Sequence, residues 1–232
     1  MDRFAARGSV PGFMPLTDTG EVTRGDHTLN PGLQPSTPLK SAAVLVPLVD
    51  YESGMSVLFT KRTAHLARHA GQVSFPGGRI EAGDGGPVET ALRETEEEIG
   101  LAPADVEVIG HLDTYVTRTG FVVTPVVGIV QPPCTLTPDP YEVAEIFEVP
   151  LAFLLDPVNH RRCSREFEGV TRHFYAMQYG GHFIWGATAG MLIDLYEVLT
   201  TPEAATVSDR SPAPAAEGKD RRDSLERRSW DR

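Results

Sequence analysis

The sequence predicts an α/β domain built on a mixed β-sheet, or on a pair of sheets, with helices on two sides. Apolar, strand-like segments are interrupted by two helix-like segments, at residues 87–99 and 187–199. Both helical segments carry an apolar arc with a 3.6-residue period, the pattern of a helix that packs on a sheet. Strands and helices in this order favour a layered α/β arrangement.

The composition favours one ordinary domain with tails. The chain has 232 residues, 41% of them hydrophobic, which is enough for a packed core. Its net charge of −11 argues against broad binding to nucleic acids or anionic membranes. The two cysteines, Cys134 and Cys163, lack metal-site spacing and fit a reducing compartment. There is neither a signal-peptide core nor a membrane-length apolar run, so we expect a cytoplasmic protein.

The first half of the chain predicts an N-terminal arm followed by the first strands. Residues 1–40 lack a clear period and are expected to be a partly ordered arm, with the domain at 41–200. Strands are expected at residues 42–49, 55–60, 106–112, 114–117 and 122–130. Residues 61–72 form a basic connection without a strand signal. Pro125 predicts an edge strand or a bulge, because proline cannot donate a ladder hydrogen bond.

The second half of the domain predicts a smaller β-unit and a final helix. A turn at 139–145 leads into a strand at 146–149 and a short helix at 150–155. A hairpin is expected over 165–177, turning near Gly169, followed by a strand at 182–185 and the helix at 187–199. Residues 201–232 are rich in Pro, Ala, Ser and charged residues, and we expect a disordered tail.

The stretch from Gly77 to Leu101 combines a glycine-rich loop with a helix whose two ends are marked. Pro87 suits the first helical position, where a missing N–H costs nothing. Gly100 suits the left-handed position just past the last turn. These signals predict a helix at about 87–99. Glycines in the preceding loop would allow close approach of a phosphate or a metal ion.

Three glutamates share one side of this helix, beside its apolar arc. Glu94, Glu97 and Glu98 stand at positions i, i+3 and i+4, so their carboxylates should converge. Close carboxylates repel one another and, near a helix C-terminus, oppose the helix dipole, so cations are expected to offset them. Carboxylate oxygens suit Mg²⁺ or Mn²⁺. An acidic, solvated helix face is the alternative reading of the same three residues.

The motif that runs from Gly78 through Asp84 to Arg93 and Leu101 resembles the Nudix box, Gly-x5-Glu-x7-Arg-Glu-U-x-Glu-Glu-x-Gly-U, where U is apolar. Three departures are present. Asp84 replaces the first glutamate, eight residues instead of seven separate Asp84 from Arg93, and Thr95 replaces an apolar residue. The first two departures, together with the segment 58–78 upstream, are similar to the coenzyme A pyrophosphatase branch of the family.

The resemblance implies an α/β/α sandwich with a mixed sheet and a metal-dependent diphosphate hydrolase that acts on coenzyme A or its derivatives. It implies products 3′,5′-ADP and 4′-phosphopantetheine, or acyl-phosphopantetheine. Glu94, Glu97, Glu98 and the carbonyl of Gly78 correspond to the metal-binding groups. Arg93 corresponds to an arginine that orients a glutamate. Glu142 corresponds to a further acidic ligand or base, with Glu145 as a near competitor.

Several residues outside the helix are candidates for contacts with the substrate. Arg62, Arg68 and His69 could meet its phosphates, with ordinary loop solubility as the alternative, and the glycine loop adds Gly77 and Gly78. Phe75 and Trp185 suit either a nucleotide pocket or the core. A homodimer is compatible with the sequence.

Two other functions remain open. One is hydrolysis of ADP-ribose or another nucleoside diphosphate derivative. The other is a non-catalytic nucleotide-binding module, which would have no chemical need for the acidic cluster.

Overall fold

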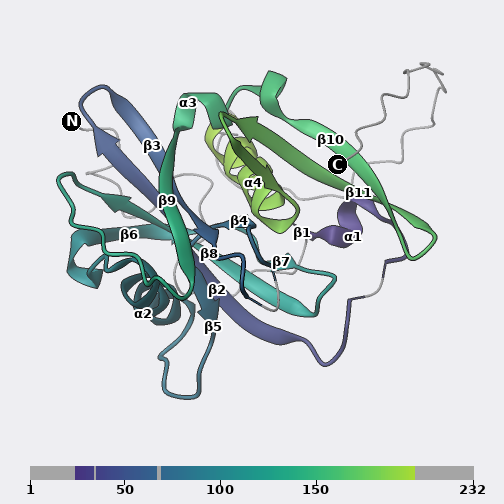
Figure 1. The fold of residues 1–232 in the computed structure, drawn as a ribbon, viewed down its shortest axis with the longest axis horizontal. Coiled ribbons are helices and arrows are strands. Elements are labelled where there is room, and N and C mark those ends of the chain that lie inside the picture. The colour runs from purple at the N-terminus through teal and green to yellow at the C-terminus, as the bar shows by residue number, and fades with distance from the viewer. Residues whose placement is uncertain (1–23, 34, 67–68, 202–232) are drawn as a thin grey trace, which may run out of the picture. The chain divides into compact units, whose positions relative to one another are not determined.

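A computed structural model describes residues 24–33, 35–66 and 69–201 of the chain. It has a nine-stranded mixed sheet, a separate three-stranded sheet and two long helices (Figure 1). The order in the large sheet is β1-β7-β8-β2-β3-β4, with β5 also paired to β2, β6 to β8 and β9 to β3. Its strands are β1 (Arg24–Gly25), β2 (Lys40–Tyr51), β3 (Gly54–Arg62), β4 (Val73–Ser74), β5 (Gly77–Arg79), β6 (Val106–His111), β7 (Tyr115–Val116), β8 (Phe121–Val130) and β9 (Val143–Pro150).

The remaining elements are mostly helical. The long helices are α2 (Pro87–Ile99) and α4 (Ala187–Thr200), and the short ones are α1 (Asp26–Leu29), α3 (Leu151–Leu154), η1 (Pro103–Asp105) and η2 (Pro157–Asn159). The small antiparallel sheet contains β10 (Arg161–Phe167), β11 (Val170–Tyr179) and β12 (His182–Trp185). Within the described ranges, no helix is long and apolar enough to cross a membrane.

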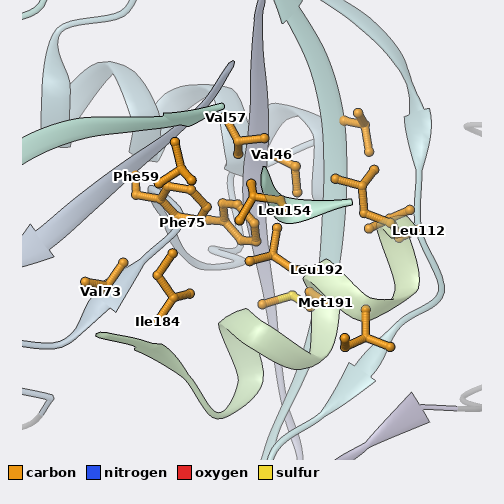
Figure 2. Packing of buried hydrophobic residues seen from close by; sticks show 14 of the residues in the cluster. Val46, Val57, Phe59, Val73, Phe75, Leu112, Leu154, Ile184, Met191 and Leu192 are labelled. Carbon is orange, nitrogen blue, oxygen red and sulfur yellow. The ribbon is translucent and has the colours of Figure 1, made fainter. Parts of the chain in front are cut away.

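Strand β2 is buried on both faces, which explains its almost continuous apolar sequence. Ala43, Leu45 and Val49 pack toward α2, in a cluster with Ala91 and Ile99 of that helix. The alternate residues of β2 pack toward α4, in a cluster that also contains Phe59, Phe75, Met191 and Leu192 (Figure 2). Helices α2 and α4 therefore cover opposite faces of the mixed sheet, and the fold is the expected α/β/α sandwich.

Helix α2 has the predicted bounds. Pro87 is its first residue, and Gly100 follows its last residue in the left-handed conformation, with φ of 70° and its N–H bonded to the Glu96 carbonyl oxygen at 2.8 Å. The local signals at both ends are thus sufficient to define this element. The hairpin that turns near Gly169 and the strand over 182–185 are also confirmed.

Three expectations about the sheet need correction. Strand β8 is interior, between β2 on one side and β6 and β7 on the other, so of the two alternatives inferred from Pro125 the edge strand is wrong, whereas an irregularity does occur in the β6–β8 pairing. Pro125 is tolerated because the strand facing it changes there: β6 ends at His111 and β7 begins at Tyr115. A register shift between Val108 and Gly110 in β6 lies nearby.

The other two corrections concern segments read as irregular. The start of the glycine loop is a short strand, β5, paired with β2, and Val73–Ser74 likewise forms β4 on β3. Strand β9 begins at Val143, inside the segment expected to be a turn.

The N-terminal arm contributes ordered structure to the domain. Strand β1 pairs in parallel with β7, and α1 follows it directly. The Asn30 side chain accepts a hydrogen bond from the His173 N–H at 2.8 Å and donates one to the His173 carbonyl oxygen at 2.9 Å. The partly ordered arm expected over 1–40 is therefore described only from residue 24 onward. Residues 1–23 and the predicted disordered tail after Thr201 lie outside the described residues.

Candidate active site

The glycine segment lies directly against the first glutamate of α2. Strand β5 pairs with β2, with Gly78 opposite Ala43. A Cβ atom placed on Gly78 would overlap the carboxylate of Glu94. Only glycine therefore lets the β5 backbone approach this carboxylate so closely.

Arg93 binds three carboxylates at once. Its Nε and Nη2 atoms each donate to Asp84, at 3.0 Å to Oδ1 and 3.0 Å to Oδ2. Nη2 also donates to Glu94 Oε1 at 3.0 Å, and Nη1 donates to Glu97 Oε2 at 3.1 Å. Arg93 therefore contacts Asp84, Glu94 and Glu97 together, and its planar guanidinium suits the bidentate contact with Asp84. The same guanidinium, with the Glu81 N–H and the Thr90 hydroxyl, lowers the pKa of Asp84.

The departures from the family pattern are accommodated locally. Asp84 reaches Arg93 and also accepts a hydrogen bond from the Thr90 hydroxyl at 2.8 Å, which ties the loop to the first turns of α2. Thr95 is fully buried where an apolar residue is usual, and its hydroxyl donates to the Ala91 carbonyl oxygen of the same helix at 2.6 Å. The hydroxyl therefore keeps a hydrogen-bond partner although it is buried.

Glu98 is the most deeply buried carboxylate of the three helical glutamates. Its side chain is 7% exposed, whereas that of Glu97 is 60% exposed. Glu98 accepts hydrogen bonds from the Gly77 N–H at 3.3 Å and from Arg62 Nη1 at 3.4 Å. Burial raises the pKa of Glu98 to about 8, and the charge of Arg62 only partly opposes this. Burial also raises the pKa of Glu94, against the effect of Arg93.

Arg62 connects the helix to the loop before β9. Its Nη2 atom donates to Glu142 Oε2 at 3.2 Å, while Nη1 contacts Glu98. The Thr63 N–H donates to the Glu142 carbonyl oxygen at 2.9 Å, which fixes this loop against the end of β3. Glu145 instead pairs with His182 at 2.9 Å and with Lys61 at 3.9 Å. Of the two competing acids, Glu142 is therefore the one that Arg62 joins to Glu98.

The donor set fits a divalent cation in its chemistry. Glu94 and Glu98 are partly desolvated carboxylates with raised pKa values, so Arg93 and Arg62 do not fully offset the effect of burial, and Gly78 brings the β5 backbone beside Glu94. The side chains, however, are not arranged as a coordination shell for such an ion. Across the described ranges, no group of three or more His, Cys, Asp or Glu side chains is placed to hold one. Arg62 and Arg93 lie among the carboxylates instead.

A cavity of about 520 Å³ extends from Arg62 and Gly77 over the α4 side of the sheet. Phe75 and Trp185 both line it, and Phe75, which is 3% exposed, belongs to the hydrophobic core as well. Phe75 also stacks on Phe59 in the core, with ring centroids 5.1 Å apart. His69 lines the cavity as well, where its Nδ1 contacts Gln72 Oε1 at 2.8 Å, and Arg68 lies outside the described residues.

The structure adds cavity residues that the sequence did not single out. Arg118, between β7 and β8, and Arg172, on β11, line the end of the cavity with Phe174. No local spacing relates these residues to the glycine loop or to α2, so no sequence signal could have grouped them.

Comparisons with known proteins agree with the motif. The model of the NUDIX domain matches residues 39–167. An uncharacterized Nudix hydrolase, NudL, from Pectobacterium atrosepticum is 37% identical over 189 residues, which cover 82% of this chain and 94% of that protein. The NudL protein of Escherichia coli K12 is 40% identical over 156 residues, 67% of this chain and 81% of that protein.

Solved structures give a weaker match. A crystal structure of the Nudix hydrolase RenU from M. smegmatis matches with a TM-score of 0.43 and 23% identity, over 49% of this chain and 71% of that one.

Proposed function

Because this chain belongs to the Nudix hydrolase family, we propose that it is a metal-dependent hydrolase of coenzyme A and its derivatives. One water molecule would be added across the diphosphate bond, which leaves 3′,5′-ADP and 4′-phosphopantetheine, or acyl-phosphopantetheine. The observation that carries the proposal is the cavity that begins at Arg62 and Gly77, beside Glu98, and continues along aromatic and basic residues. A volume of about 520 Å³ suits a nucleotide-sized group.

The proposed site combines carboxylates of α2 with two arginines, Arg93 of α2 and Arg62 of β3. Glu94, Glu97 and Glu98, with the carbonyl of Gly78, would hold Mg²⁺ or Mn²⁺. When bound, the metal supplies positive charge to the diphosphate and lowers the pKa of a coordinated water. Arg93 holds Glu94 and Glu97 in place through the hydrogen bonds described above.

The remaining proposed groups handle the proton and the phosphates. Glu142, whose side chain is 46% exposed and which is not assigned to the metal, would accept the proton of the attacking water. Arg62 is bound to both Glu98 and Glu142 and would be shared with the phosphates of the substrate. Gly77, His69 and Arg68 complete the proposed phosphate contacts. We place the reaction in the cytoplasm, which the free cysteines Cys134 and Cys163 support.

Product analysis tests the proposal. Purified protein is incubated with Mg²⁺ or Mn²⁺ and with coenzyme A, acyl-coenzyme A, NADH or ADP-ribose, and the products are separated and identified. We expect 3′,5′-ADP from coenzyme A. Product from ADP-ribose alone would instead support the nucleoside diphosphate alternative, and no turnover with either metal would favour a binding module. Light scattering on the same sample measures whether the protein is the proposed homodimer.

A further inference from the structure

The end of the cavity away from the glutamates contains two arginines without acidic partners. Arg118 lies in the turn between β7 and β8, and Arg172 lies on β11. Neither forms an ion pair within the described residues. The Nε atom of Arg172 is also buried and has no hydrogen-bond partner among the described residues. A guanidinium group that lines a cavity without an acidic partner favours an anionic ligand, because charge-assisted hydrogen bonds offset its desolvation.

The charge of the cavity lining favours an anion. The lining includes Arg62, Arg118 and Arg172, against a single acidic residue among its described members, Asp26. The carboxylate of Asp26 is already engaged, because it accepts hydrogen bonds from the Arg118 N–H at 2.7 Å and from the Tyr115 hydroxyl at 2.9 Å. Asp26 therefore holds the turn in position, and among the described residues neither the Arg118 nor the Arg172 guanidinium has an acidic partner.

Arg118 is held on a well-defined turn. The Thr117 N–H donates to the Phe121 carbonyl oxygen at 2.8 Å, and the Gly120 N–H donates to the Thr117 carbonyl oxygen at 3.1 Å. Gly120 has φ of 87°, and a side chain there would overlap the Ser36 carbonyl oxygen, so glycine is needed at this position. The Arg118 guanidinium lies 4.6 Å from the centre of the Phe167 ring. Such a pre-positioned cation loses little entropy when it binds a ligand.

We propose that Arg118 and Arg172 bind a second phosphate of the substrate, a monoester on the ribose that is remote from the cleaved diphosphate. Phe174 and Trp185, whose ring centroids are 5.3 Å apart, line the same cavity and supply apolar surface for a base. Guanidinium groups suit phosphate oxygens through charge-assisted hydrogen bonds. This inference rests on the proposed function, in which the monoester is the 3′-phosphate of coenzyme A.

The first test compares coenzyme A with 3′-dephospho-coenzyme A, which has the same diphosphate and lacks only the monoester. For the unmodified protein we expect kcat/KM to be about tenfold or more higher for coenzyme A, the size of one charge-assisted contact. Arg172→Gln and Arg118→Gln should each raise KM for coenzyme A by about tenfold and leave the constants for the dephospho compound unchanged. Arg161→Gln, on the exposed surface of β10 and outside the cavity lining, is the matched control and should change neither substrate.

Equal kcat/KM for the two substrates in the unmodified protein, or an equal loss on both substrates in Arg172→Gln, would overturn the inference and leave the proposed hydrolase intact. Absence of product from both substrates would instead refute the proposed function. A binding measurement covers that case, because it needs no turnover.

Calorimetric titration of the unmodified protein with 3′,5′-ADP and with 5′-AMP should show tighter binding of 3′,5′-ADP, by about tenfold. This difference should disappear in Arg172→Gln. Equal affinities for the two nucleotides would refute the monoester site directly. Repeating the titration with NADPH and NADH distinguishes a 2′-phosphate from a 3′-phosphate as the preferred monoester, and a larger preference for NADPH would overturn the 3′ assignment. Thermal unfolding of each variant checks that it is folded.

Discussion

The carboxylate of Glu98 is held between the backbone N–H of Gly77 and the guanidinium of Arg62, at 3.3 Å and 3.4 Å. One residue of α2 is thereby bound both to the glycine segment and to the end of β3. The relationship places a desolvated carboxylate in contact with Arg62 and Gly77, two residues that line the cavity. Its charge is costly there, as the raised pKa of about 8 indicates. A carboxylate that is buried at such a cost in free energy is a candidate for a functional residue.

Replacing Glu98 with glutamine should abolish most activity without unfolding the protein. Glutamine keeps the shape and removes the charge, so we expect kcat to fall by about 100-fold or more. The free energy of unfolding should not decrease at neutral pH, because burial disfavours the charged form. Steady-state kinetics and thermal unfolding measure the two effects. Glu96→Gln, at an exposed position of the same helix, is the control and should retain activity.

Replacing Arg93 with lysine should separate the effect of its positive charge from the effect of its hydrogen-bond geometry. Lysine keeps one positive charge but cannot hold Asp84 through two hydrogen bonds while also binding Glu94 and Glu97. We expect kcat to fall by about 10- to 100-fold and the affinity for Mn²⁺ to weaken by a similar factor. Kinetics and Mn²⁺ titration followed by electron paramagnetic resonance measure these changes. Unchanged metal affinity would show that Arg93 does not position the glutamates.

Replacing Gly78 with alanine should displace Glu94 and leave the fold intact. The added methyl group would overlap the Glu94 carboxylate, which can move because it is the end of a flexible side chain. Since a shift of about 1 Å at a reactive group can cost about 100-fold in rate, we expect a loss of that order. Gly83→Ala is the matched control, because nothing lies near the methyl group that it would add. Equal activity in the two variants would contradict the proposed role of Glu94.

The sequence predicted the parts of the site that depend on local spacing. Gly78, Asp84, Arg93 and the helical glutamates belong to one loop and one helix, whose ends are marked by Pro87 and Gly100. Helical geometry then determines which side chains are neighbours. Helical geometry also predicts that Arg93 lies close to Glu94 and Glu97, because all three residues are within about one turn of α2.

Contacts between distant segments could not be predicted in this way. The contact of Arg62 with Glu98 depends on how β3, β5 and β9 pair around α2, and strand registers are not encoded in spacing. Arg118 and Arg172 line the same cavity because the segments that carry them both pack near α1. The edge position predicted for the strand of Pro125 was wrong because the neighbouring strand changes from β6 to β7 at that point. This change is a property of the assembled sheet.

The stability of the fold should depend on pH through Asp194, which does not line the cavity of the proposed site. Asp194 is 2% exposed, contacts Arg24 Nε at 2.9 Å and lies near Asp113 and Glu197. Burial raises its pKa to about 6, despite the opposing charge of Arg24. Between the unfolded pKa of about 4 and this value, the folded state binds the extra proton. This group therefore makes the protein more stable as the pH falls through that window, and less stable as the pH rises.

Asp194→Asn should remove this pH dependence. Urea unfolding at pH 4.5 and 7.5 gives the free energy of unfolding of both proteins. Relative to the variant, the unmodified protein should gain about 2 kcal/mol at the lower pH, since one pKa unit corresponds to about 1.4 kcal/mol and pH 4.5 covers about one and a half units below the folded pKa. Glu107→Gln, at an exposed position of β6, is the control. A difference between unmodified protein and Asp194→Asn that is the same at both pH values would show that Asp194 titrates alike in the folded and unfolded chains.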